Sequence, residues 1–80
     1  MKWHELMPAV QAGIRCHQPS FWAFLREERF CVISEEKDAA RAVRALCGVA
    51  SRADLREPEA GARWRRLDDC YTAWMVRERT

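Results

Sequence analysis

The chain has 80 residues, of which 49% are hydrophobic, and its 14 Lys or Arg against 12 Asp or Glu leave a net charge of +2. This length supports one small core of limited stability, so part of the apolar surface can be buried in a homo-oligomer. The low net charge argues against direct nucleic-acid binding, and no apolar run is long enough to be a signal segment or to cross a membrane. We therefore expect a single domain over residues 1–80 that stays in the cytoplasm.

Helical spacing of apolar residues predicts a first helix that begins near Glu5 and ends at Gly13. The residues of its apolar face are Trp3, Leu6, Met7, Val10 and Ile14. Alternation over residues 14–18 then predicts a strand, which Pro19 and Ser20 end. The β-prone runs 22–26 and 29–33 flank two glutamates and predict a hairpin.

A second helix is predicted from Ser34, which would cap it, to Cys47, with Gly48 as its stop. Acidic residues near its start suit the positive end of the helix dipole. Its apolar face consists of Ala39, Ala40, Val43, Leu46 and Cys47. The outward residues Lys37, Arg41 and Arg44 could dock an acidic partner, although a solvated face is the ordinary explanation.

The last third is predicted to be a loop followed by two strands. Residues 51–61 include Pro58 and Gly61 and favour a loop, with one helical turn after Ser51. Residues 64–67 and 71–77 are β-prone, Asp68 and Asp69 could form the turn between them, and residues 78–80 are expected to fray. The fold class that follows is α+β, with the N-terminal helix and the second helix packed on an antiparallel sheet.

No set of residues assembles into a catalytic or metal site. Cys16, Cys31, Cys47 and Cys70 contain no C-x-x-C pair, which favours free buried thiols over a disulfide framework or a zinc site. Cys16 and His17 are neighbours, so on a strand they would point to opposite faces rather than form a dyad. We therefore expect no enzyme activity, no catalytic residue, no metal and no cofactor.

Aromatic residues interleave with arginines, a composition that can stack a base and hold a phosphate, or form a protein-binding hot spot. The residues are Phe21, Trp22, Trp64, Tyr71 and Trp74 with Arg15, Arg26, Arg63, Arg65 and Arg66. At least half of the aromatic residues are expected to belong to the core. The candidate ligand- or partner-binding residues are Arg15, Gln18, Phe21, Trp22, Arg26 and Trp74.

Two segments resemble the Thoeris anti-defence type two family of small phage proteins. The first contains Trp3, Glu5, Leu6, Ala9, Ala12 and Gly13 and continues through residues 14–21; the second contains Asp68, Thr72, Trp74 and Val76. Gln18, Phe21 and Ala73 depart from the family pattern, which tends to have arginine, tryptophan and aspartate there. The resemblance implies a helix on an antiparallel sheet, oligomer formation and sequestration of a nucleotide immune signal.

The leading hypothesis is a phage or prophage anti-defence protein that acts in the host bacterial cytoplasm by stoichiometric binding. Its partner would be a nucleotide second messenger, which it sequesters. The alternative partner is a bacterial immune effector protein, such as a CRISPR-Cas complex that an anti-CRISPR inhibitor binds and blocks. A second alternative is a small nucleic-acid-binding regulator that reads its target with the second helix.

Overall fold

The regular structure of the chain is entirely helical in a computed structural model that describes residues 2–79. In chain order the elements are η1 (Trp3–Glu5), α1 (Pro8–Cys16), α2 (Pro19–Arg29), α3 (Glu36–Cys47), η2 (Arg52–Arg56) and α4 (Pro58–Arg79), where η denotes a 3-10 helix. No strand occurs in residues 2–79, so the predicted α+β class and its antiparallel sheet are wrong. Thr80, the last residue of the predicted frayed tail, lies outside the described residues.

Three of the four α-helices begin with a proline. Pro8, Pro19 and Pro58 are the first residues of α1, α2 and α4. Proline suits this position because its fixed φ is already helical and its missing N–H has no intrahelical acceptor there. Pro19 and Pro58, which predicted the end of a strand and a loop, therefore mark the starts of helices.

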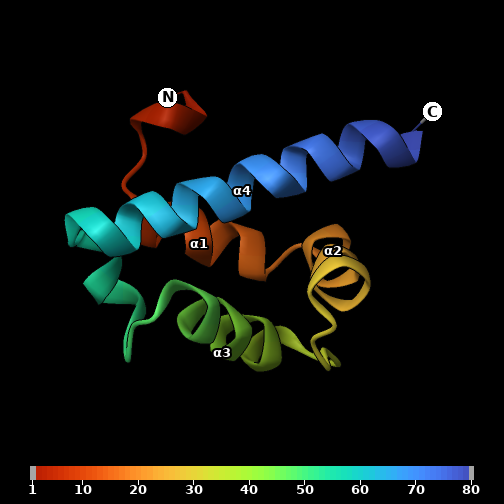
Figure 1. Ribbon diagram of the computed structural model, residues 1–80, viewed down its shortest axis with the longest axis horizontal. Coiled ribbons are helices and arrows are strands. Elements are labelled where there is room, and N and C mark those ends of the chain that lie inside the picture. The colour runs from red at the N-terminus through yellow and green to blue at the C-terminus, as the bar shows by residue number, and fades with distance from the viewer. Residues whose placement is uncertain (1, 80) are drawn as a thin grey trace.

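Helix α4 is the longest element and lies along the whole molecule (Figure 1). Its 22 residues correspond to about 33 Å of helix, and α1, α2 and α3 all pack against it. Its buried side is formed by Ala60, Gly61, Trp64, Leu67, Asp68, Tyr71 and Trp74. Spacings of three and four residues make this one helical face, so the strands predicted at 64–67 and 71–77 are wrong and Asp68 lies inside a helix.

The predicted hairpin is replaced by α2 and an extended segment. Phe21, Phe24 and Leu25 are buried at helical spacing, and burying them together outweighs the β propensity of the aromatic residues. The helix ends at Arg29, and Phe30 follows with a left-handed φ of 56°. The strand predicted at 14–18 is also wrong, because α1 continues through Gly13 to Cys16.

The second predicted helix is confirmed as α3. It ends at Cys47, and Gly48 follows in the left-handed conformation with a φ of 70°. It begins at Glu36 rather than at Ser34, and the Asp38 carboxylate accepts hydrogen bonds from the backbone N–H groups of Ser34 and Glu35. The helical turn expected after Ser51 is η2.

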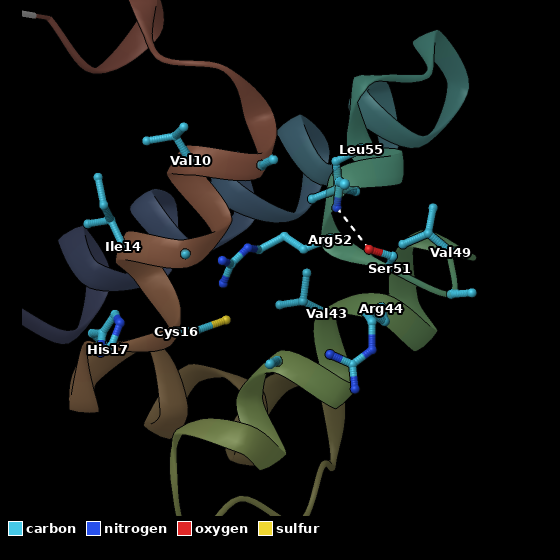
Figure 2. A pocket seen from close by; sticks show the side chains of 15 residues that line it. Val10, Ile14, Cys16, His17, Val43, Arg44, Val49, Ser51, Arg52 and Leu55 are labelled. Carbon is cyan, nitrogen blue, oxygen red and sulfur yellow. Dashed lines mark hydrogen bonds between the residues drawn. The ribbon is translucent and has the colours of Figure 1, made fainter.

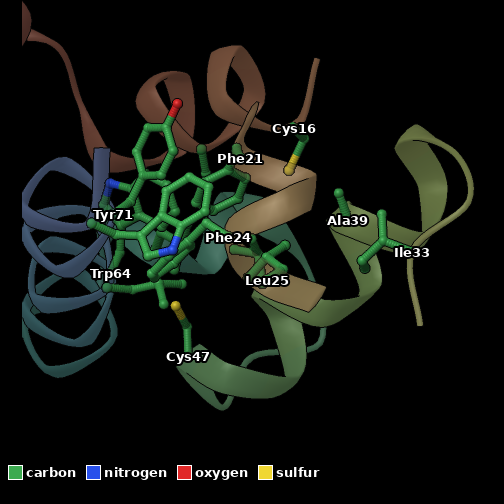
Figure 3. Packing of buried hydrophobic residues seen from close by; sticks show 14 of the residues in the cluster. Cys16, Phe21, Phe24, Leu25, Ile33, Ala39, Cys47, Trp64 and Tyr71 are labelled. Carbon is green, nitrogen blue, oxygen red and sulfur yellow. The ribbon is translucent and has the colours of Figure 1, made fainter. Parts of the chain in front are cut away.

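The centre of the core is an aromatic cluster between α2 and α4 (Figure 3). Phe21 lies at its centre, with ring centroids 5.9 Å from Phe24, 6.1 Å from Trp64 and 5.1 Å from Tyr71. Trp74 extends the cluster through Phe24 and Tyr71. Edge and tilted contacts of this kind add stabilisation to the burial of the apolar area itself.

A polar network ties the N-terminus and α1 to α4. The buried Asp68 accepts hydrogen bonds from Trp3 Nε1 at 2.7 Å and from Arg15 Nε at 2.8 Å. Gln11 accepts one from Trp64 Nε1 at 2.9 Å and donates one to the Trp3 carbonyl at 2.8 Å. These polar groups can be buried because each has a partner.

Replacing Asp68 with alanine should lower the free energy of unfolding by about 3 kcal/mol or more, since it leaves the Arg15 guanidinium without its buried carboxylate. Urea denaturation measures the change. Asp69→Ala is the matched control, because Asp69 is the exposed neighbour on the same helix. Equal stability of the two variants would contradict a central role for Asp68.

The same substitution at two helical glycines should have opposite effects. A Cβ at Gly61 would lie 2.9 Å from the Leu55 carbonyl oxygen, whereas at Gly13 it would meet only the movable end of the Arg52 side chain, at 3.3 Å. Gly61→Ala should therefore destabilise by about 1–3 kcal/mol, and Gly13→Ala should stabilise by up to about 1 kcal/mol through helix propensity. Thermal denaturation compares them, and a Gly61→Ala variant at least as stable as Gly13→Ala would refute the close packing of η2 on α4.

Candidate functional site: a groove between α1, α3 and η2

Two of the residues predicted to bind a ligand belong to the polar network. Arg15 donates to Asp68, and its guanidinium lies 4.0 Å from the centre of the Trp3 ring and 4.8 Å from that of Tyr71. It also donates to Gln18 Oε1 at 3.3 Å. Arg15 and Gln18 are thus brought together, but the Arg15 charge already has a carboxylate partner.

The other four predicted residues are also occupied by contacts within the chain. Phe21 and Trp74 are buried in the aromatic cluster. Trp22 is half-buried, and its Nε1 donates to the Cys16 carbonyl at 2.7 Å. Arg26 donates to the Ile33 carbonyl at 3.0 Å and does not join the others in a pocket.

A different part of the surface forms a groove of about 890 Å³ between α1, α3 and η2 (Figure 2). The α1 side is contributed by Ala9, Val10, Gly13, Ile14, Cys16 and His17. Facing it are Ala40, Val43 and Arg44 of α3, and Val49, Ala50, Ser51, Arg52, Ala53 and Leu55 of the following segment. The lining contains no Phe, Tyr or Trp. Its chemistry is therefore aliphatic, with a small number of cationic groups.

The apolar wall on α1 is the face that the sequence predicted to be in the core. Val10 is 48% exposed and Ile14 is 39% exposed, whereas the buried residues of α1 are Gln11, Ala12 and Cys16. The sequence contained a signal for this exposed wall. α1 carries apolar residues on more than one face, and a single small core cannot cover all of them. Exposed apolar residues that line a concave surface are typical of a binding site.

Two arginines border this wall without an internal partner. Within residues 2–79, neither the Arg44 nor the Arg52 guanidinium forms a hydrogen bond or an ion pair. Arg52 extends from η2 toward α1 (Figure 2), where the missing side chain of Gly13 leaves room for it. The groove therefore combines aliphatic walls with two cationic groups that can receive an anion. The sequence pattern predicts Arg44 on an outward stripe, and no motif points to Arg52.

Cys16 forms part of the groove lining but is a buried thiol. Burial raises the pKa of the Cys16 thiol from 9.0 to about 11, an effect that Arg52 and Arg44 oppose and Glu36 reinforces. The thiol is thus protonated and poorly nucleophilic at neutral pH. At the same end of the groove, His17 Nδ1 lies 2.9 Å from Glu36 Oε2, which links the end of α1 to the start of α3.

A second exposed apolar feature lies between α2 and α3. Phe30 is 87% exposed and Val32 is 88% exposed, while Ile33 points into the core. None of these residues is part of the groove lining. Phe30 and Val32 add a separate apolar contact point on the surface.

Comparison with models of known protein families, with curated proteins and with solved structures finds no match.

Among residues 2–79, no group of three or more His, Cys, Asp or Glu side chains is arranged to hold a metal ion. The described helices include none with the length and apolar character needed to span a membrane. All four cysteines are free; Cys16 and Cys47 are buried as expected, whereas Cys70 is exposed.

Ionisation of Cys16 should make the protein less stable at alkaline pH. Because its folded-state pKa exceeds its unfolded value, this thiol contributes stability that is complete below pH 9.0 and is lost as pH rises through about 11. Between these limits, the free energy of unfolding of the wild type should fall more steeply than that of Cys16→Ala. Urea denaturation at several pH values gives both slopes, and parallel slopes would contradict the burial of this thiol.

Proposed function

We propose that this protein is a small anti-CRISPR-type inhibitor, which acts stoichiometrically by binding and blocking a bacterial immune effector protein. One observation carries the binding mode: an aliphatic groove with two unpaired guanidinium groups, on a domain whose aromatic rings are mostly inside. Interfaces of this kind combine apolar contact area with a few charged groups that fix orientation. The role in immunity rests on the sequence hypothesis, and the protein-binding mode rests on the geometry.

Sequestration of a nucleotide has less support. Nucleotide sites commonly stack the base on an aromatic side chain. The groove lining has no Phe, Tyr or Trp, and its one ring, the His17 imidazole, lies 2.9 Å from the Glu36 carboxylate. In addition, the described residues include no buried side-chain nitrogen or oxygen that lacks a hydrogen-bond partner, so only Arg44 and Arg52 in the groove lining offer unpaired charged donors to a small polar ligand. The resemblance to the Thoeris anti-defence family stays a prediction, and the sheet that it implied is replaced by helices.

A nucleic-acid regulator that reads its target with α3 also has less support. On this helix Arg41 Nη1 lies 3.7 Å from Asp38 Oδ1, and Lys37 Nζ lies 3.8 Å from Glu35 Oε2 at its start. Acidic side chains therefore lie next to Lys37 and Arg41, two of the exposed cationic residues of this helix. Its outer face is not the concentrated positive surface that phosphate backbones require.

The proposal predicts that the protein will restore phage growth in bacteria that carry a matching CRISPR-Cas system. Strains that each carry one defence system are challenged with a targeted phage, with and without the protein. Val10→Glu should abolish the rescue, because it places a charge in the aliphatic wall, and it should weaken binding to the effector by at least about tenfold, or 1.4 kcal/mol.

Val76→Glu is the matched control, since Val76 is 65% exposed on α4 and lies outside the groove. It should leave the rescue unchanged. A protein that suppresses no CRISPR-Cas system would overturn the proposal. If Val10→Glu retains the rescue and Phe30→Ser loses it, the contact surface is the segment between α2 and α3 rather than the groove.

A further inference from the structure

We infer that the groove takes an amphipathic α-helix of the partner, which packs an aliphatic face between α1 and α3 and presents an Asp or Glu side chain to Arg44 and Arg52. The inference deepens the proposed function and rests on it for the identity of the partner. It specifies what that partner must present at its surface.

The groove excludes two of the common modes of peptide recognition. Addition of an extended peptide to a sheet requires an exposed strand edge, and residues 2–79 contain no strand. Polyproline segments are bound by grooves lined with aromatic residues, and no Phe, Tyr or Trp lines this groove. A helix that lays its apolar face into an aliphatic groove uses the side chains that are present.

The length of the wall suits about two turns of helix. From Ala9 to His17 the lining residues of α1 span about 12 Å at 1.5 Å per residue. Side chains at i, i+3 or i+4, and i+7 of a bound helix span about 10.5 Å by the same rise. Two or three aliphatic anchors on one face of a helix can therefore contact the exposed Val10 and Ile14 side chains along the groove.

The two arginines determine the charge that this helix must carry. Arg15 is paired with Asp68 and Arg63 donates to the Cys47 carbonyl, so these guanidinium groups are already used within the domain. Arg44 and Arg52 have no such acceptor among the described residues and stand beside aliphatic walls. A helix bound there would remove water from both. The pairing that offsets this loss is a carboxylate, which a guanidinium can bind through two parallel hydrogen bonds.

The test is a selection from a displayed library of helical peptides about 18 residues long, a length at which isolated helices can form. The library varies apolar and charged positions independently, and the intact protein is the target. Enriched peptides should share aliphatic residues at i, i+3 or i+4, and i+7, together with an acidic residue. They should be helical when bound and should shift the NMR signals of Val10, Ile14 and Ala53, which line the groove and are not buried.

A double-mutant cycle then tests the ion pair. Replacing the acidic residue of an enriched peptide with glutamine should weaken binding about tenfold, and so should Arg52→Gln in the protein. The two changes together should weaken binding little more than either change alone. Arg65→Gln is the control, because Arg65 is exposed on α4 outside the groove. The inference would be overturned if the two losses of affinity were additive, or if the enriched peptides lacked an acidic residue. It would also be overturned if the peptides bound outside the groove, or if no peptide were enriched. Displacement of the peptide by duplex DNA would also overturn it, in favour of a phosphate ligand.

The two proposals can fail separately. An acidic helix selected by the groove, with no CRISPR-Cas system suppressed, would support the recognition chemistry and overturn the proposed function. Rescue of phage growth that Val10→Glu abolishes, without selection of an acidic helix, would support the function and overturn the inferred partner.

Discussion

The buried carboxylate of Asp68 is the interaction on which the arrangement of the helices depends. It accepts hydrogen bonds from Trp3 and Arg15 and so joins the N-terminal segment and α1 to the middle of α4. The Arg15 guanidinium is in turn sandwiched by aromatic rings. A charge in this position is tolerated only because an opposite charge and a second donor meet it at hydrogen-bond distance. This fixes which side of α1 faces the core.

The groove is a consequence of that orientation. α1 turns Gln11 and Arg15 inward, where they satisfy Trp64 and Asp68. Val10 and Ile14 are left exposed on α1 at the rim of the groove, where Figure 2 shows them projecting away from α3 and η2. The usual division of a helix into an apolar inner face and a polar outer face is partly reversed, and the exposed aliphatic wall is the result. The exposed aliphatic residues and residues of the buried polar network thus belong to the same helix.

The candidate site could not be found from residue types alone. Arginine and aromatic residues were expected to meet around a ligand, and they do meet, but within the domain: Arg15 lies against Trp3 and Tyr71, and Phe21 lies among other rings. Nothing in the type of a residue distinguishes an arginine that binds an internal carboxylate from one that is unpaired. That difference depends on Asp68, which is 53 positions from Arg15 in the chain.

By itself, the sequence determined the local events: α3 from its apolar spacing to the stop at Gly48, the turn after Ser51, and the absence of a C-x-x-C pair. Its three prolines also marked the starts of three helices, although the pattern predicted a strand end at Pro19 and a loop around Pro58. Only the tertiary structure decided that residues 64–77 are helical and that the Val10 face of α1 is outside. Aromatic and β-branched residues fit strands and helices alike, and the choice between them depends on which packing buries Phe21, Trp64 and Tyr71 together and still pairs Asp68. Those contacts join residues far apart in the chain, so no local pattern contains them.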